Sequence, residues 1–224
     1  ENINRLCGAL HPDAARDLLL HEHADFAVAL DGDADRAIFV DDTGEILDGD
    51  HVLAMCAKEM HEKRTLKGDT VVATVMSNLG LELALQSLGV KLMRAEVGDR
   101  YVVERMLEGG YNLGGEQSGH LLFLDHNTTG DGAITCLQVL SLMVEKGRRL
   151  SELKRVMTRL PQVLLNVNVR EKKDFAQMPK LALKLRDAHH ALNGRGRTLI
   201  RYSGTEMLAR IMIEGEDGIV IQAM

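Results

Sequence analysis

Apolar residues along the chain follow two spacings, and each spacing predicts one kind of element. Short apolar runs bounded by polar residues, such as Phe-Ala-Val-Ala-Leu at 26–30, are typical of buried strands. Longer stretches with apolar residues three and four positions apart predict helices. We therefore expect helices at 13–21, 50–64, 79–88, 100–107, 133–146 and 180–192, and strands at 26–30, 37–40, 69–75, 90–93, 163–169, 198–202 and 208–214.

The order of these elements indicates an α/β protein. Strands and helices alternate through the first two thirds of the chain, which is typical of sheets whose strands are joined by crossover helices. Near residue 161 the order changes to strand, helix, strand, strand, with the first of these strands alternating as if one of its faces were exposed. The pattern predicts a mixed-sheet α/β region followed by a small α+β C-terminal domain.

Composition narrows the class of protein. The chain is 45% hydrophobic, enough for a packed core, and its 27 Lys and Arg against 33 Asp and Glu give a net charge of −6. A nucleic-acid binder needs a basic face and often aromatic platforms, and aromatic residues make up only 3% here. No apolar run has the length of a membrane span. Three scattered cysteines, Cys7, Cys56 and Cys136, argue against a disulfide framework. We therefore expect a cytoplasmic protein with reduced thiols that binds neither nucleic acid nor membrane.

A loop with three carboxylates follows the expected strand at 26–30. Asp31, Asp33 and Asp35 occupy alternate positions and precede Arg36. Two unit charges ~4 Å apart repel by about 4 kcal/mol at an effective dielectric constant of ~20, and a divalent cation removes this repulsion. Carboxylate oxygens suit a hard cation such as Mg²⁺. We interpret the loop as a Mg²⁺ site in preference to a solvated acidic turn.

Aspartate-rich loops of two other protein families have a similar pattern. An EF-hand has glycine at its sixth and glutamate at its twelfth position, where this chain has Arg36 and Asp42. A haloacid-dehalogenase-like sugar phosphatase also places Asp-x-Asp after an apolar strand, and Asp31 would then be the nucleophile. Such phosphatases usually have Thr or Val at the position of Asp35. On the residues alone, this second alternative stays open.

A glycine-rich loop at 114–120 is the second candidate. Its glycines permit close backbone approach and positive φ angles. Glu116 and Ser118 offer one acceptor and one donor on a tight bend, a pairing that suits sugar hydroxyls. Taken alone, a glycine-rich hairpin with incidental polar residues explains the loop nearly as well.

The third candidate loop begins at Arg201. Arginine presents a planar fork of donors to phosphate. Ser203 and Thr205 add hydroxyls, Gly204 frees backbone N–H groups for an anion nest, and Arg210 offers a further cation. The three loops together predict sites for a metal, a polyol and a phosphate, which a phosphosugar would satisfy in one cleft.

These motifs resemble the α-D-phosphohexomutase family in sequence and in order. The resemblance covers essentially the whole chain, because linking segments match as well as loops. The matching segments are Asp-Gly-Asp-Ala-Asp-Arg at 31–36 (metal loop), Gly-Glu-Gln-Ser-Gly-His at 115–120 (sugar loop), Arg-Tyr-Ser-Gly-Thr-Glu at 201–206 (phosphate loop), and the links at 97–102 and 124–131. Gln117 and the segment at 124–131 resemble the bacterial phosphoglucosamine mutase branch. Tyr202 and Met207 stand where proline is common in the family.

The resemblance implies a reaction, a cofactor and a partner. The family interconverts 6-phospho and 1-phospho sugars through a phosphoserine enzyme and a 1,6-bisphosphate intermediate, with Mg²⁺ as the cofactor. For this branch the resemblance implies glucosamine 6-phosphate and glucosamine 1-phosphate, on the route to UDP-N-acetylglucosamine and peptidoglycan. The expected partner is a small phosphosugar, and a homodimer is left open.

The resemblance also implies a role for individual residues. Arg36 would be the catalytic cation that neutralises the transferring phosphoryl group. The remaining roles would be metal binding by Asp31, Asp33 and Asp35, sugar binding by Glu116 and Ser118, phosphate binding by Arg201, Ser203, Gly204 and Thr205, and lining of the cleft by Gly98, Asp99, Arg100 and Arg210.

The same resemblance divides the chain into domains. Residues 1–47 would end a second domain, 48–158 would form a third and 159–224 a fourth. The family nucleophile lies in a Ser-His-Asn-Pro-like motif of the first domain, and no serine of this chain lies in such a motif. Because the chain opens on Glu1, not Met, we expect part of a longer enzyme that is inactive alone. A metal- and phosphosugar-binding module without chemistry is the competing hypothesis.

Overall fold

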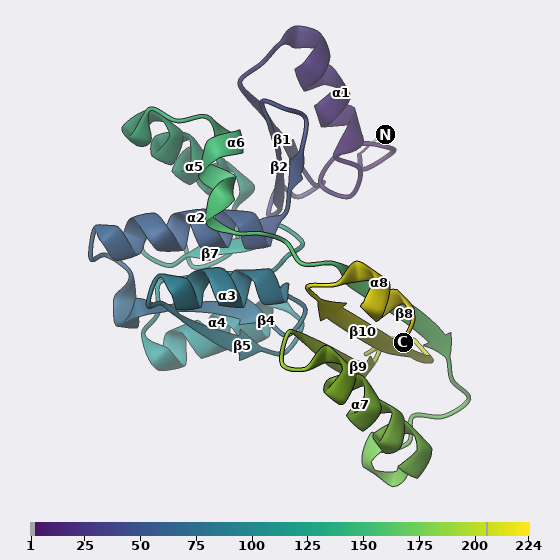
Figure 1. The fold of residues 1–224 in the computed structure, drawn as a ribbon. Helices are drawn as coiled ribbons and strands as arrows, with labels where there is room; N and C mark the ends of the chain where they lie inside the picture. The colour runs from purple at the N-terminus through teal and green to yellow at the C-terminus, as the bar shows by residue number, and fades with distance from the viewer. Residues whose placement is uncertain (1–2, 205) are drawn as a thin grey trace. The chain divides into compact units, whose positions relative to one another are not determined.

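The computed structural model describes residues 3–204 and 206–224. It contains two compact units, Glu1–Thr158 and Arg159–Met224 (Figure 1). Sheets and helices are mixed in the first unit, and the second is a small α+β unit, which confirms the expected fold class.

A three-stranded antiparallel sheet opens the first unit. Its strand order is β1 (Phe26–Leu30), β2 (Ala37–Asp41) and β3 (Ile46–Leu47), and α1 (Asp13–Glu22) lies beside it. Leu30 pairs with Ala37, so the residues between them form the loop of a β-hairpin. The register of β1 and β2 therefore folds the acidic segment at 31–36 into a single short loop.

The larger sheet of the first unit has four strands. Their order is β5 (Lys91–Ala95), β4 (Thr70–Thr74), β6 (Leu113–Gly115) and β7 (Leu121–Phe123). The first three are parallel, and β7 runs antiparallel to β6. The sequence pattern showed only a glycine-rich segment where β6 and β7 form. Each is three residues long, too short to reveal a period.

Helices surround this sheet in the first unit. They are α2 (Gly49–Glu62), α3 (Leu79–Ser87), α4 (Asp99–Gly109), α5 (Gly132–Lys146) and α6 (Leu150–Leu153), with short 3₁₀ turns η1 (Lys67–Asp69) and η2 (Lys154–Val156). All except the short α6, η1 and η2 were expected from the spacing of apolar residues, with ends shifted by one or two residues.

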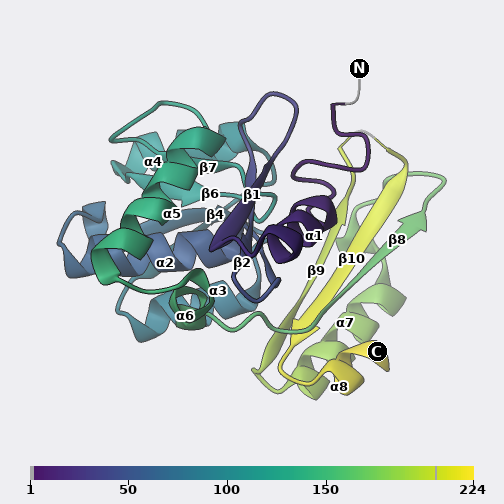
Figure 2. The same cartoon turned by 90° about the horizontal axis from the view of Figure 1, so that it is seen from above.

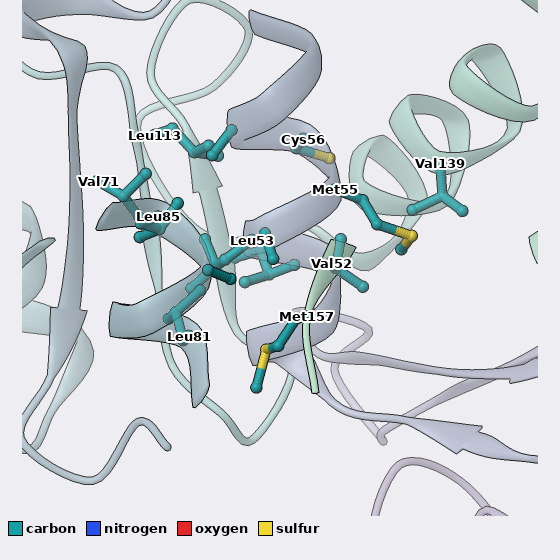
Figure 3. Close-up of a cluster of buried hydrophobic side chains, with 14 of the residues drawn as sticks. Val52, Leu53, Met55, Cys56, Val71, Leu81, Leu85, Leu113, Val139 and Met157 are labelled. Carbon is teal, nitrogen blue, oxygen red and sulfur yellow. The ribbon is translucent and has the colours of Figure 1, made fainter. Parts of the chain in front are cut away.

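The core of the first unit forms around α2. Every residue of this helix from Gly49 to Ala57 is buried, so it packs on all sides. Figure 3 shows Val52, Leu53 and Met55 of α2 among apolar side chains of α3, β4, β6 and α5. Phe39 of the smaller sheet belongs to the same cluster. This cluster therefore contains residues of both sheets.

The second unit is a three-stranded antiparallel sheet with helices packed on it. The strand order is β8 (Gln162–Asn168), β10 (Leu208–Gly215) and β9 (Gly196–Tyr202). Helix α7 (Pro179–Leu192) packs on β9, and α8 (Gly218–Gln222) packs on β10 and β8 (Figure 2). The turn η3 (Phe175–Gln177) precedes α7. The expected alternation along the first strand is wrong, because β8 is an edge strand exposed on both faces from Leu164 onward.

Two expectations from composition concern the whole described chain. Among the described helices, none combines the length and hydropathy needed to span a bilayer. No disulfide joins any two of Cys7, Cys56 and Cys136. Burial, with a smaller contribution from the charge of Glu59, raises the pKa of the Cys56 thiol to about 12, so this thiol is unreactive at neutral pH.

Candidate functional site

The three predicted metal ligands lie together in the β1–β2 loop. One carboxylate oxygen each of Asp31, Asp33 and Asp35 lies within 4.8 Å of the others. Asp31 is held in place by Arg36, whose backbone N–H donates to Asp31 Oδ1 over 3.1 Å and whose Nε lies 3.7 Å from Oδ2. The loop therefore gathers three carboxylate oxygens, the kind of ligand that a hard cation prefers.

Asp35 carries a further sign of a cation site. Its Oδ1 is buried and has no hydrogen-bond partner among the described residues, and its Oδ2 lies 3.4 Å from Nε2 of His120. Burial raises the pKa of the Asp35 carboxyl, His120 opposes that shift, and the charges of Asp31 and Asp33 add to it. A divalent cation would neutralise this repulsion and bind the unpartnered oxygen, so the donor set fits Mg²⁺.

His120 joins the metal loop to the sugar loop. The side chain is buried at 3% exposure. Arg36 and His120 form an isolated antiparallel bridge, and the N–H of Ala37 donates to the carbonyl of Gly119 over 3.1 Å. In the sequence, His120 stands only at the end of the glycine-rich motif. Its contact with Asp35 links two segments far apart in the chain, which no local pattern signals.

The sugar loop is a tight turn between β6 and β7. The carboxylate of Glu116 accepts the N–H of Gly98 at Oε1 over 3.0 Å and the hydroxyl of Ser118 at Oε2 over 3.2 Å. Because Glu116 is only partly buried, its oxygens still have room for further donors. The structure thus brings Gly98, Glu116 and Ser118 together.

Asp99 and Arg100 do not reach the Glu116 carboxylate by any described contact. Asp99 begins α4, and its side chain accepts the N–H of Arg100 over 2.7 Å. The guanidinium of Arg100 is exposed and pairs with Glu104 over 2.7 Å on the same helix. In this structure the side chains of these two predicted residues therefore make their contacts within helix α4.

The start of α2 supports the sugar loop. Asp48 caps the helix by accepting the N–H of His51 over 3.3 Å, and its other oxygen accepts Nε2 of Gln117 over 3.3 Å. The N–H of Gly49 donates to the carbonyl of Gln117 over 3.0 Å. A side chain at position 49 would overlap the carbonyl oxygen of Glu116. Only glycine permits this close approach of helix and loop.

The start of α5 supports the metal loop in the same way. Asp131 caps the helix by accepting the N–H of Ile134 over 2.9 Å. The N–H of Gly132 donates to the carbonyl of Ala34 over 2.8 Å, inside the metal loop. Two Asp-Gly helix starts thus hold the two loops of the first unit, and no pattern in the sequence indicated either role.

The phosphate loop (201–206) lies in the second unit, where two arginines stand side by side. Arg201 and Arg210 are direct partners across β9 and β10. The Nε atoms of both are buried and have no hydrogen-bond partner among the described residues. Burial lowers the pKa of Arg201, and the positive charge of Arg210 lowers it further. Buried donors and neighbouring like charges are both costly, and an anion would satisfy them.

The turn after Arg201 brings further polar groups to this place. Ser203 is buried, and its Oγ accepts the N–H of Glu206 over 3.2 Å. The carboxylate of Glu206 lies 3.4 Å from the guanidinium of Arg210. Gly204 is exposed with open space around it, and Thr205 lies outside the described residues. Arg210 therefore already pairs with one anionic group, the carboxylate of Glu206.

Comparison with known proteins identifies the family. The model for "Phosphoglucomutase/phosphomannomutase, alpha/beta/alpha domain III" matches residues 48–160, and that for "Phosphoglucomutase/phosphomannomutase, C-terminal domain" matches residues 164–222. The chain belongs to this family. It corresponds to the C-terminal part of a phosphohexomutase, and the resemblance seen in the sequence is confirmed. This match decides against the dehalogenase-like alternative.

Individual relatives of this phosphohexomutase chain are bacterial enzymes. The phosphoglucosamine mutase of Geobacter sp. strain M21 is 57% identical over 216 residues, which are 96% of this chain and 48% of that protein. The phosphoglucosamine mutase of Caldanaerobacter subterraneus is 50% identical over 226 residues, covering 100% of this chain and 51% of the relative. The chain spans about half the length of these relatives.

Solved structures with the same fold include more distant proteins. An Aspergillus fumigatus N-acetylphosphoglucosamine mutase, in complex with GlcNAc-6P and magnesium, is 22% identical with a TM-score of 0.76 and covers 98% of this chain and 55% of its own. A phosphoglucomutase/phosphomannomutase family protein from Burkholderia thailandensis is 21% identical with a TM-score of 0.76, covering 96% of this chain and 48% of its own.

Proposed function

We propose that this chain provides the metal, sugar and phosphate loops of a phosphoglucosamine mutase, which interconverts glucosamine 6-phosphate and glucosamine 1-phosphate. The observation that carries this proposal is the direct connection of the metal loop to the sugar loop through His120 and Asp35. Phosphoryl transfer to a sugar requires a cation and hydroxyl-binding groups close together. The names of the bacterial relatives support glucosamine as the sugar.

Asp31, Asp33 and Asp35 would hold Mg²⁺. When bound, the ion would neutralise negative charge on a phosphoryl group during transfer. Arg36 would act beside it, because its guanidinium faces Asp31 and its buried Nε has no hydrogen-bond partner among the described residues. His120 and Gly132 would keep the loop in the conformation that the ion requires.

The sugar and phosphate loops would orient the substrate. Glu116 would accept hydrogen bonds from sugar hydroxyls, and Ser118 would donate or accept one. The phosphate away from the reaction would bind in the second unit, where Arg201 and Arg210 supply charge. The other groups proposed there are Ser203, Gly204 and Thr205, and those proposed to line the first unit's site are Gly98, Asp99 and Arg100.

The nucleophile belongs to the same proposal. No serine of this chain lies in a Ser-His-Asn-Pro-like motif, so we place the phosphoserine and the 1,6-bisphosphate cycle in an enzyme that includes the half of its relatives that this chain does not span. The reaction would supply an amino-sugar phosphate for UDP-N-acetylglucosamine and peptidoglycan in the cytoplasm.

Calorimetry on the 224-residue chain tests binding. With MgCl₂ present, the chain should bind glucosamine 6-phosphate, and Glu116→Gln and Arg201→Met should each weaken binding roughly tenfold. Glucosamine without phosphate should bind far more weakly. Equal affinity for glucosamine and its phosphate would contradict the proposal.

A coupled assay tests the chemistry. The chain alone should not form glucosamine 1-phosphate. Turnover should appear when the half of the Geobacter relative that this chain does not span is added as a separate polypeptide. Turnover by the chain alone would show that the nucleophile is misassigned. Release of inorganic phosphate that Asp31→Asn abolishes would instead support a phosphatase.

A further inference from the structure

The segment between β8 and η3 lies against the phosphate loop. Phe175 stacks on the ring of Tyr202, with 4.3 Å between ring centroids and 16° between ring planes. The hydroxyl of Tyr202 donates to the carbonyl of Lys173 over 2.7 Å. Tyr202 is itself part of the phosphate loop and directly precedes Ser203. Two independent contacts therefore fix this segment beside the loop.

One lysine of this segment reaches the loop directly. Nζ of Lys172 donates to the backbone carbonyl of Ser203 over 2.6 Å. The adjacent Lys173 points to Glu171, with 2.6 Å between Nζ and Oε1. Among the ion pairs of residues 3–204 and 206–224, none involves Lys172. Among the described residues, no carboxylate pairs with its positive charge, and the Ser203 carbonyl is the one acceptor found for its three N–H donors.

The charge at the phosphate loop depends on this lysine. Arg201 and Arg210 contribute two positive charges, and Glu206 contributes one negative charge 3.4 Å from Arg210. With Lys172 the sum is plus two, which matches the dianion of a phosphate monoester at neutral pH. Without Lys172 the sum is plus one.

We infer that Lys172 is a positioning residue for the phosphate of the substrate. It holds the carbonyl of Ser203, and so the turn that follows, and it adds a third cation to the phosphate loop. The Tyr202–Phe175 stack is the device that keeps Lys172 there. This inference rests on the proposed function, because it assigns the ligand of this loop as a phosphate monoester.

The test compares two neighbouring lysines in the 224-residue chain. Calorimetric titration with glucosamine 6-phosphate, and separately with inorganic phosphate, should show about fivefold weaker binding of both in Lys172→Met. Because one cation is lost, the dependence of affinity on salt should also become shallower. Lys172→Arg should restore the affinity to within about twofold. Lys173→Met is the matched control and should bind like the wild type.

The outcomes separate this inference from the proposed function. If the wild type and Arg201→Met bind phosphate equally, the loop is not a phosphate site and the proposed function fails. If Arg201→Met loses binding but Lys172→Met keeps wild-type affinity and salt dependence, the role of Lys172 is refuted alone.

A second variant covers the case in which Lys172→Met unfolds the second unit. Tyr202→Phe removes only the hydroxyl that holds Lys173 and keeps the stack on Phe175. It should weaken phosphate binding about twofold to threefold without a large change in the unfolding midpoint. Unchanged phosphate affinity in Tyr202→Phe would overturn the inference.

Discussion

Replacing Gly132 by alanine tests whether the start of α5 holds the metal loop. A Cβ at this position would lie 2.6 Å from Cδ2 of Leu30, 2.9 Å from the carbonyl oxygen of Ala34 and 3.1 Å from that of Arg36. The Leu30 methyl can rotate away, but the carbonyl of Ala34 cannot retreat freely, because it accepts the N–H of the same residue over 2.8 Å. The new methyl and the existing hydrogen bond compete for one oxygen.

The magnitude follows from opposing effects at Gly132. Relieving the contact needs a shift of about 0.5 Å, and overpacking of this kind costs about 1–3 kcal/mol. Weakening the hydrogen bond to Ala34 adds about 0.5–1.5 kcal/mol. Alanine in place of glycine in a helix returns at most about 1 kcal/mol. The destabilising effects exceed the gain from alanine, and we expect the free energy of unfolding to fall by about 0.5–3.5 kcal/mol.

Urea unfolding followed by circular dichroism measures this change, and hydrogen exchange localises it. Gly132→Ala should lower the unfolding midpoint and speed exchange at residues 31–37. Gly218→Ala is the matched control, because Gly218 also follows a capping aspartate, and a Cβ there would lie 3.5 Å from Pro161, an ordinary contact. The control should be neutral or slightly stabilising. If Gly132→Ala were as stable as the wild type, with unchanged exchange in the loop, the start of α5 would not hold the metal loop.

Three further changes have defined outcomes. Lys154→Met removes an ammonium that donates to the fully buried Asp41 and should lower the free energy of unfolding by about 3 kcal/mol. Burial raises the pKa of Asp41, but hydrogen bonds led by that of Lys154 outweigh burial and hold the pKa below its ordinary value of 3.8. Urea melts should therefore show this contribution above pH 3.8 and its loss in stronger acid. Burial raises the pKa of Asp50 to about 7, so the folded state binds this proton more tightly than the unfolded state. The free energy of unfolding should therefore fall as pH rises from 3.8 to about 7. Asp50→Asn should flatten that slope, and an unchanged slope would show that Asp50 does not cause it. Glu206→Gln removes the carboxylate beside Arg210 and should strengthen phosphate binding about twofold to fivefold by calorimetry, whereas weaker binding would show that Glu206 supports the site.

Long elements of this fold could be predicted from the sequence because their periods are repeated several times. Helices α2 and α5 begin and end within two residues of the expected limits. Strands β6 and β7 could not be predicted, because three residues show no period and because their positions depend on pairing, of β6 with β4 and of β7 with β6. The five-residue helix α8 was missed for the same reason.

Some residues of the candidate site could be predicted from a local sequence pattern, and others could not. The aspartates of the metal loop were predictable, since alternating carboxylates after a buried strand carry their own chemical signal, and the structure brings them together. His120 and Lys172 were not predictable as partners of the loops. Each acts through contacts with residues distant in the chain, and only the packing of the elements creates those contacts.

The proposed function requires that the sugar loop and the phosphate loop each take part in binding glucosamine 6-phosphate. The most direct measurement is a titration of the ¹⁵N-labelled chain with glucosamine 6-phosphate in MgCl₂, followed by amide chemical shifts. We expect the amides of Gly98 and Ser118 near the sugar loop, and those of Ser203 and Gly204 in the phosphate loop, all to shift on titration. Shifts absent from either pair of amides would refute the proposed role of that loop.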